Sequence, residues 1–335
     1  MRRVNMIVGS AIQWLIIVLN VINAQEFIVL DNPGYPDPLG GRPRAPGPAN
    51  IDRFDPNMQT PYATQATAGA KRELAGGFAV SADYLYVRGY DQLRRRDLNA
   101  PPDGSRVRPD PTMGRVLLHE ATGDRAYHAL ILNAERRFAD RWRATAAYTL
   151  SKTMSDSEAR NSTTLPTNQY DLHADWGPAD ADARHNLVAT GQVTLAYGIN
   201  LSGILQRRSA FPFSPASGRD TNNDSRSGDR PDPDPNGAYP TNGVTTYGRF
   251  SIPVNRPGTL GRNAFRGPDF RRLDLRVSKA VPMARRRLEL MVEAFNVTNR
   301  VNFNSYTSSI QSQFFGKPQS ADNPRQVQLG VRFDF

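Results

Sequence analysis

Three residues in the second half of the chain have part of the spacing of a calcium-binding loop. Asp220, Asn222 and Asp224 place a side-chain oxygen at every second position, which is how such a loop begins. Ser225 then stands where the sharp turn needs glycine, and Pro231 stands where a bidentate glutamate closes the site. Because of these departures the sequence favours the tip of a solvated loop, with a weak calcium candidate as the alternative.

Carboxylates and imidazoles are also concentrated in an earlier polar stretch. The residues there that could bind a metal or transfer protons are Asp171, His173, Asp175, Asp180, Asp182 and His185. An ordinary polar loop has the same composition, so a functional cluster and a plain loop both agree with the sequence. The chain has no cysteine, and no nucleophile motif or phosphate-binding glycine loop accompanies the cluster. We therefore expect no enzyme, no catalytic residues and no cofactor.

The chain of 335 residues is strongly basic, with a net charge of +10 and a pI near 10.1. Such a balance raises the question of nucleic-acid binding. The basic residues are scattered singly along the whole chain, and no nucleic-acid-binding motif is visible, so we predict no nucleic-acid partner. The mean hydropathy of -0.56 argues against a helical membrane protein. It is compatible with a β-barrel, in which only alternate residues need to be apolar.

The elements that would position these polar residues are clearest at the C-terminus. From Val327 to Phe335, apolar residues occupy every odd position, and polar residues or glycine occupy every even one. Side chains on a strand alternate between two faces, so one face is apolar and the other polar. The length matches the about 9–11 residues of a transmembrane strand, whereas a soluble strand is more often about 5–6 residues long. This strand alone fits both a soluble sandwich and a lipid-facing barrel.

Alternating segments recur upstream in pairs that are joined by short turns. The pairs are 62–74 with 78–86, 127–138 with 142–152, 184–197 with 200–208, and 272–277 with 287–294. The longest polar stretches between them are 155–183, 209–268 and 299–324. Outer-membrane barrels alternate short turns with long loops, whereas soluble sandwiches rarely do. The pattern predicts an all-β fold, an antiparallel transmembrane β-barrel, partial or small, of about ten strands with long polar outer loops.

Several aromatic residues lie near the ends of the predicted strands. They are Tyr84, Tyr86, Trp142, Tyr148, Tyr197, Phe333 and Phe335. Aromatic girdles of a membrane barrel occupy such positions. Packing in a soluble core is the alternative.

The N-terminal region divides into two parts. Residues 1–24 have two arginines, an apolar run and a final small residue, which is the layout of a signal peptide. Gln13 and Asn20 interrupt the run, so a buried or frayed segment is the alternative. Residues 25–61 are rich in proline and glycine and predict a loop or linker. We assign the barrel segment to residues 62–335.

The order and spacing of several stretches resemble the C-terminal part of the barrel of TonB-dependent outer-membrane transporters, specifically the Oar-like group. The resemblance covers residues 54–335 and is carried by 60–65, 127–136, 147–152, 182–186, 218–224, 229–231, 271–279, 293–302 and 326–335. It implies a receptor or transporter whose outer loops capture a ligand, which then passes a plug under the action of TonB. It also implies that the terminal strand with Phe333 and Phe335 is the signal read by the barrel-assembly machinery.

This chain departs from that family in length. Family members are several times longer, close a barrel of about 22 strands and carry a plug and a TonB box, neither of which is visible here. We therefore expect either the distal portion of a truncated or split gene product or a small complete barrel. The expected partners are outer-membrane lipid, the barrel-assembly machinery, and TonB through a missing plug region. The alternative from another class is a secreted, soluble β-rich adhesion or carbohydrate-binding module. The sequence has no readable code for the ligand.

Overall fold

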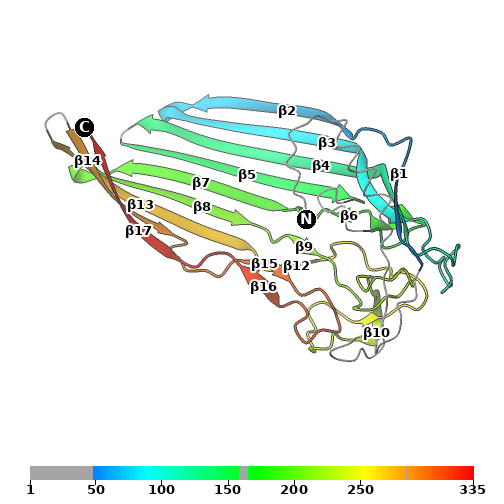
Figure 1. Ribbon diagram of the computed structural model, residues 1–335. Helices are drawn as coiled ribbons and strands as arrows, with labels where there is room; N and C mark the ends of the chain where they lie inside the picture. The colour runs from blue at the N-terminus through cyan, green and yellow to red at the C-terminus, as the bar shows by residue number, and fades with distance from the viewer. Residues whose placement is uncertain (1–47, 140, 158–164, 284–285) are drawn as a thin grey trace, which may run out of the picture.

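The computed structural model describes residues 48–139, 141–157, 165–283 and 286–335. Within these residues, one sheet of eleven strands contains a path of nine strands in which every neighbouring pair is antiparallel, and β1 (Ile51–Phe54) and β6 (Gly177–Pro178) join it beside that path (Figure 1). The nine strands follow one another in chain order across the sheet: β2 (Tyr62–Leu74), β3 (Phe78–Asp97), β4 (Val116–Ala139), β5 (Trp142–Ser155), β7 (His185–Thr194), β8 (Ile199–Arg208), β13 (Phe270–Met283), β14 (Arg286–Phe295) and β17 (Gln326–Asp334). The expected all-β, antiparallel architecture is confirmed, and the sheet is not closed into a barrel within the described residues.

Short turns join these strands at one end of the sheet. Between β2 and β3, Gly76 and Gly77 have φ of 74° and 75°, a left-handed conformation that glycine adopts without steric cost. Between β7 and β8, Tyr197 and Gly198 have φ of 60° and 70°. Turns of this length leave only an antiparallel arrangement and fix the register of the strands. All four hairpins expected from the sequence are present, and β13 continues to Met283, beyond the expected end of its alternating segment at residue 277.

The register gives the sheet two chemically different faces. One row across six strands is apolar and consists of Leu329, Val292, Val277, Leu201, Val193 and Trp142. The adjacent row on the opposite face is polar and consists of Gln328, Glu293, Arg276, Ser202, Gln192 and Arg143. The polar face is cross-linked, since Gln328 Nε2 donates to Glu293 Oε2 at 2.6 Å and Lys71 Nζ lies 3.0 Å from Glu135 Oε1. Leu329 on the apolar face is 80% exposed, as a lipid-facing side chain would be in a protein described without its membrane.

Two strands run much further than the sequence pattern indicated. β3 has 20 residues and β4 has 24, although about 9–11 residues suffice to cross a bilayer. The extensions have polar residues on both faces and are held by ion pairs inside the protein. Arg94 Nη2 lies 2.9 Å from Asp156 Oδ2, and Arg96 Nε lies 3.1 Å from Glu120 Oε2. The predicted start of β4 at residue 127 was wrong, since β4 begins at Val116. The alternation of apolar and polar residues ends where the strand leaves the part of the sheet that has one apolar face.

The aromatic residues do not all lie at strand ends. Phe78 packs edge-on against Trp142 beside the short turns, and Phe333 stacks on Phe335. Tyr84 and Tyr148, in contrast, lie well inside β3 and β5, because both strands continue far beyond them. Each donates or accepts a hydrogen bond of 2.7 Å with a histidine, His128 for Tyr84 and His185 for Tyr148.

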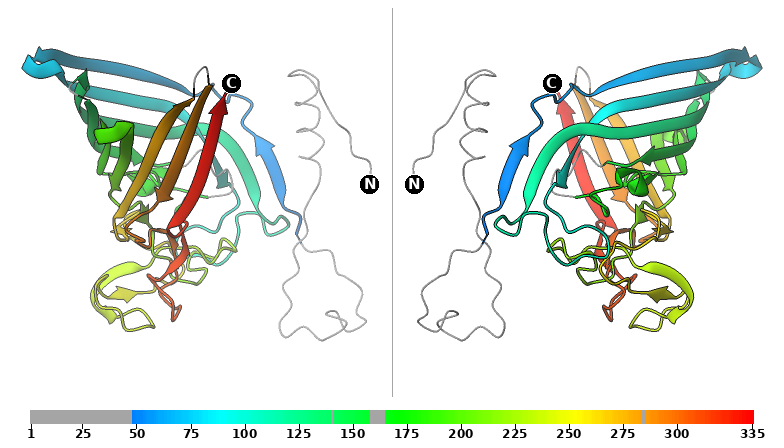
Figure 2. Two further views of the ribbon diagram at one scale, coloured as in Figure 1. Left: turned by 90° about the vertical axis from the view of Figure 1, so that its left-hand side faces the viewer. Right: turned by 90° about the vertical axis from the view of Figure 1, so that its right-hand side faces the viewer.

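The long loops gather at the end of the sheet opposite to the short turns and the C-terminus (Figure 2). They contain short strands: β6 (Gly177–Pro178), β9 (Pro212–Phe213), β10 (Asp232–Ala238), β11 (Phe250–Ser251), β12 (Phe265–Arg266), β15 (Phe303–Tyr306) and β16 (Pro318–Ala321). The loops have a hydrophobic core of their own, formed by Phe250, Leu260, Ile310 and Phe315. They are therefore a folded layer rather than the plain polar loops expected, and we call them the loop layer.

The N-terminal expectations are only partly covered by the structure. The signal peptide expected at 1–24 lies outside the described residues. Ile51–Phe54, inside the stretch expected to be a linker, forms β1 and pairs in parallel with β4. No helix in the described ranges is long and apolar enough to cross a membrane.

Candidate binding site in the long loops

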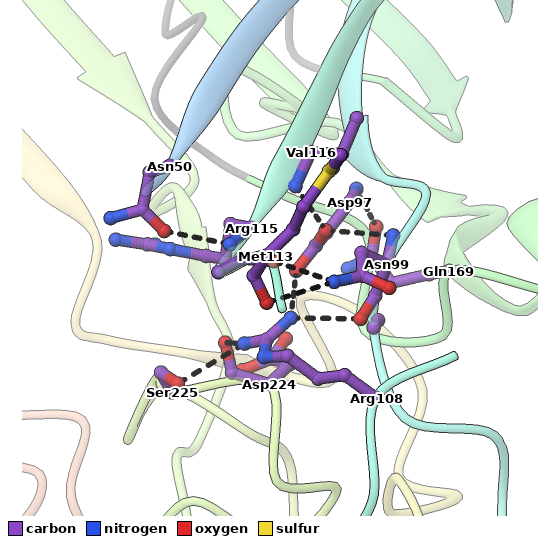
Figure 3. A network of polar contacts seen from close by, with 12 residues as sticks. Asn50, Asp97, Asn99, Arg108, Met113, Arg115, Val116, Gln169, Asp224 and Ser225 are labelled. Carbon is purple, nitrogen blue, oxygen red and sulfur yellow. Dashed lines mark hydrogen bonds and ion pairs between the residues drawn. The ribbon is translucent and has the colours of Figure 1, made fainter. Parts of the chain in front are cut away.

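Asp97, the last residue of β3, is the centre of a buried polar network (Figure 3). Its side chain is completely buried. Oδ1 accepts hydrogen bonds from the backbone N–H groups of Asn99 and Val116, at 3.0 and 2.9 Å, and Oδ2 accepts one from Arg108 at 2.9 Å. The Asp97 backbone N–H donates to Gln169 Oε1 at 2.8 Å. The carboxylate thus joins the ends of two strands and the loop between them, and the backbone N–H of the same residue joins them to a second long loop.

Arg108 extends this network to the longest loop. Its Nη1 also donates to the carbonyl oxygen of Asn99 at 2.9 Å. Its Nη2 donates to the carbonyl oxygen of Asp224 and to Ser225 Oγ, both at 3.2 Å (Figure 3). The planar guanidinium has donors in fixed directions, so it can hold three chain segments in one geometry. Arg108 therefore fixes the backbone of residue 224 but does not contact its carboxylate.

The three residues of the calcium candidate lie together in this loop. Asp220 Oδ1 and Oδ2 accept hydrogen bonds from the backbone N–H groups of Asp224 and Ser225, at 3.1 and 2.8 Å. Asn222 Oδ1 accepts a second bond from the Asp224 N–H at 3.1 Å. Ser225 has φ of 72°, so it adopts the left-handed conformation for which glycine is the usual residue. The loop is therefore ordered by its own side chains.

The carboxylate of Asp224 is the least satisfied group of this loop. Asp224 is 2% exposed, and its Oδ1 accepts no hydrogen bond within the described residues. Burial, followed by the negative charges of Asp229 and Asp220, raises the pKa of Asp224 to about 7. The positive charge of Arg226 acts in the opposite direction but does not outweigh them.

Asp229 closes the loop from the other side. Its Oδ2 accepts hydrogen bonds from the N–H and hydroxyl of Thr221, at 2.6 and 3.0 Å, and from the N–H of Asn222 at 3.3 Å. Burial raises the pKa of Asp229 as well, while these hydrogen bonds lower it. Among the described residues, no three histidine, aspartate or glutamate side chains converge as a set of metal ligands.

The second polar cluster is dispersed into separate pairs. Asp175 Oδ1 lies 2.6 Å from Arg230 Nη2, Asp182 is bonded to Arg266, and Asp180 Oδ1 accepts from Asn263 Nδ2 at 2.7 Å. The other members act locally: Asp171 accepts from the N–H of His173, and His185 is bonded to Tyr148. The pairs attach the loop that follows β5 to the loop that follows β8. The structure thus supports the plain-loop alternative rather than a metal or acid–base centre.

A cavity of about 200 Å³ lies between these loops. Its charged lining consists of Arg94, Asp156, Asp175, Asp180, Asp224, Arg226, Asp229, Arg230 and Arg262. Most of these groups pair with one another, and such a lining suits a small polar or charged ligand rather than an apolar one. Asp224 of the calcium candidate and Asp229, which closes the same loop, both line this cavity.

Sequence reasoning missed the residues that organise the site. Asp97 lies beyond the predicted end of its strand at residue 86, and Arg108 lies between the first two predicted hairpins. Residues 229–231 are among the stretches that carry the family resemblance, and this is the one signal for them in the sequence. Their partners come from segments far away in the chain, so only the folded structure identifies them.

Comparison with known proteins agrees with the architecture. The family of the outer membrane beta barrel domain matches residues 19–328. Among solved structures, the outer membrane transporter YddB from Escherichia coli has a TM-score of 0.54 and 12% identity, over 86% of this chain and 34% of that one. An identity this low supports similarity of fold alone.

Two further solved structures, a transporter and a receptor, align less closely. The FrpB iron transporter from Neisseria meningitidis has a TM-score of 0.47 and 14% identity, over 84% of this chain and 32% of that one. The ferripyoverdine receptor of Pseudomonas aeruginosa has a TM-score of 0.48 and 13% identity, over 83% and 28%. No curated protein sequence matches this chain. The chain spans roughly a third of the length of YddB, as the 34% coverage states.

Proposed function

The chain belongs to the family of outer membrane beta barrel domains, and from this premise we propose that it is the ligand-capturing barrel portion of a TonB-dependent receptor or transporter of the Oar-like group. Its location is the cell outer membrane. The apolar face of the sheet meets lipid, and the polar face lines the lumen. The soluble, secreted adhesion or carbohydrate-binding module considered from the sequence does not agree with this location.

One observation carries the proposal. All the long loops leave the same end of a membrane-length sheet, and there they fold into a layer with its own hydrophobic core and a charged cavity. A structural barrel needs only enough loop to connect its strands, whereas a receptor needs a shaped surface facing the medium. The fold similarity to the transporter YddB supports the same assignment.

The proposed transport cycle needs more than the described sheet. Within the described residues, β2 and β17 each have one unpaired edge, and unpaired backbone groups are strongly unfavourable in lipid. We propose that strands outside the described residues pair with these edges, as in a truncated or split transporter whose remaining barrel and plug are supplied separately. TonB would act through that plug.

The aromatic end of the terminal strand β17 supports a role for this strand in assembly of the barrel. Phe335 is 98% exposed and stacks on Phe333 at the apolar face of the edge strand β17. We propose that this aromatic end is recognised by the barrel-assembly machinery. Removal of Phe335 should reduce the amount of protein in the outer membrane, and unchanged assembly of that variant, measured by heat-modifiable gel mobility, would remove the role.

Transport is tested in cells with and without the gene. We compare cells that lack the gene with the same cells complemented with the full chain, and measure which compounds each strain removes from the medium. Both strains are tested with and without TonB. We expect at least one compound whose removal requires both the chain and TonB. If none does while the protein is present in the outer membrane, the barrel assignment stands and the transport function is wrong.

A further inference from the structure

Asp224 has a buried charge that the surrounding protein does not balance. Its Oδ1 has no hydrogen-bond partner within the described residues, and its Oδ2 has only a 3.5 Å contact with the amide of Asn222. The residue is 2% exposed, so bulk water does not solvate it either. A buried carboxylate in this situation requires a proton or a cation.

The guanidinium groups nearby do not fill this role. Arg108 donates to the backbone carbonyl oxygen of residue 224, not to its carboxylate. Arg226 contributes positive charge, but the combined effect of Asp229, Asp220 and burial is larger. The carboxylate oxygen is therefore directed into an acidic region that is still short of positive charge.

The two neighbouring carboxylates have different roles. That of Asp220 orders the loop, and that of Asp229 has an oxygen available to bind a cation. Both oxygens of Asp220 are already occupied by backbone N–H groups. Asp229 receives its three hydrogen bonds on Oδ2, which orients the carboxylate and leaves Oδ1 outside these bonds. The available anionic oxygens are thus those of Asp224 and Asp229.

We propose that the loop from Asp220 to Asp229 binds one calcium ion through the carboxylates of Asp224 and Asp229, with neutral oxygens and water completing the coordination. Calcium accepts six to eight oxygen ligands in a flexible geometry, whereas magnesium demands a nearly regular octahedron. Only two carboxylates would ligate, which agrees with the lack of a three-acid cluster in the described residues. Such a site should be weak, with a Kd of roughly 0.1–1 mM as in other extracellular modules.

The site would also affect the neighbouring loops. Arg108 links the backbone of residue 224 to the buried carboxylate of Asp97. Asp224 and Asp229 line the cavity of about 200 Å³. Calcium at Asp224 would therefore stabilise the contact between the loops at 98–115 and 209–269 and fix one wall of the cavity. This inference does not depend on the transport function.

Calcium binding is measured by equilibrium dialysis with radioactive calcium on the purified full chain in detergent. We expect saturable uptake of about one equivalent with a Kd of roughly 0.1–1 mM. Asp224→Asn, which keeps the shape of the side chain, should weaken binding by at least about tenfold, since loss of even a group that supports a metal ligand costs about 10–100-fold in affinity, and Asp229→Asn should do the same. Heat-modifiable mobility verifies that each variant is folded.

Asp234→Asn is the matched control, because it removes the same charge from the same loop at a residue whose Oδ1 only accepts the N–H of Asn236. It should leave calcium uptake unchanged. The proposal is wrong if the wild-type chain shows no saturable uptake up to about 10 mM calcium, well above the range of extracellular sites. It is equally wrong if Asp224→Asn and Asp234→Asn bind calcium alike, since the carboxylate of Asp224 would then be neutralised by a proton.

Discussion

At the residue scale, the buried carboxylate of Asp224 should make the loop layer sensitive to pH. Its pKa is about 7 in the folded protein, against an ordinary value of 3.8. The folded state therefore keeps the proton over a range in which the unfolded state has lost it. The resulting stability declines as the pH rises from about 4 to about 7, by up to about 1.4 kcal/mol per pH unit, and is level above that range.

Urea denaturation in the presence of EDTA, followed by tryptophan fluorescence to which Trp176 of the loop layer contributes, measures this dependence. Asp224→Asn has no titratable carboxyl group at this position. It should therefore remove most of the decline in stability between pH 4 and 7, the range between the ordinary pKa and the raised pKa of Asp224. The burial-raised pKa of Asp229 contributes in the same direction and should persist in the variant. Identical pH profiles of the two proteins would contradict the assignment of the shift to Asp224.

Arg108→Ala should loosen the loop layer without affecting the sheet. The side chain of Asp97 is completely buried, and removal of its cation leaves an uncompensated charge, which costs about 3–5 kcal/mol in comparable buried pairs. Limited proteolysis should then cut the loop at 209–269 much faster. Arg106→Ala is the control, since Arg106 makes only an exposed hydrogen bond to Asn255 and its loss should cost about 0.5 kcal/mol or less. Equal cleavage rates in both variants would show that Asp97 is not the centre of the network.

At the scale of the element, adjacent residues of β17 should differ sharply in their tolerance of charge. Leu329 lies in the apolar row, and Gln328 lies opposite Glu293 in the polar row. Leu329→Arg should destabilise the folded sheet in lipid vesicles by about 2–4 kcal/mol if the residue is near the bilayer midplane. Gln328→Arg should have little effect, because it places a cation beside a carboxylate. Urea unfolding in vesicles measures both, and a greater loss for Gln328→Arg would reverse our assignment of the two faces.

The alternation of apolar and polar residues predicts the length of some strands correctly and of others incorrectly. β2 begins and ends at Tyr62 and Leu74, the positions expected from alternation and from the following glycine pair. β4 begins eleven residues before the expected position 127, at Val116. Apolar and polar residues alternate where one side of a strand faces lipid and the other faces water. The alternation therefore disappears where both sides of the strand contact protein or solvent. The extensions of β3 and β4 therefore could not be predicted from periodicity.

At the scale of the whole molecule, the two ends of the sheet should lie on opposite sides of the membrane. The chain has no cysteine, so single cysteines can report topology. Thr246→Cys in the loop layer should react with a membrane-impermeant maleimide on intact cells. Ala196→Cys in a short turn should react only after lysis. Both residues are exposed, so solvent access within the protein does not separate them. Labelling of Ala196→Cys on intact cells would invert the proposed orientation.

The candidate site was only partly accessible from the sequence. Asp220, Asn222 and Asp224 are near neighbours in the chain, so their spacing alone indicated that their oxygens could meet. The dependence on Asp97 and Arg108 was invisible, because those residues are more than one hundred positions away. For the same reason the sequence could not separate the six acidic and histidine residues at 171–185 into different pairs.

The sequence by itself determined the type of protein, because side-chain alternation, turn residues and loop lengths act locally and are written along the chain. From them follow an antiparallel sheet, its apolar and polar faces, and the segregation of long loops at one end. Only the tertiary structure decided that these loops form a layer with its own core, and that the carboxylate of Asp224 is buried without a partner. Burial and ion pairing depend on which distant segments of the chain come into contact, and local sequence patterns do not contain that information.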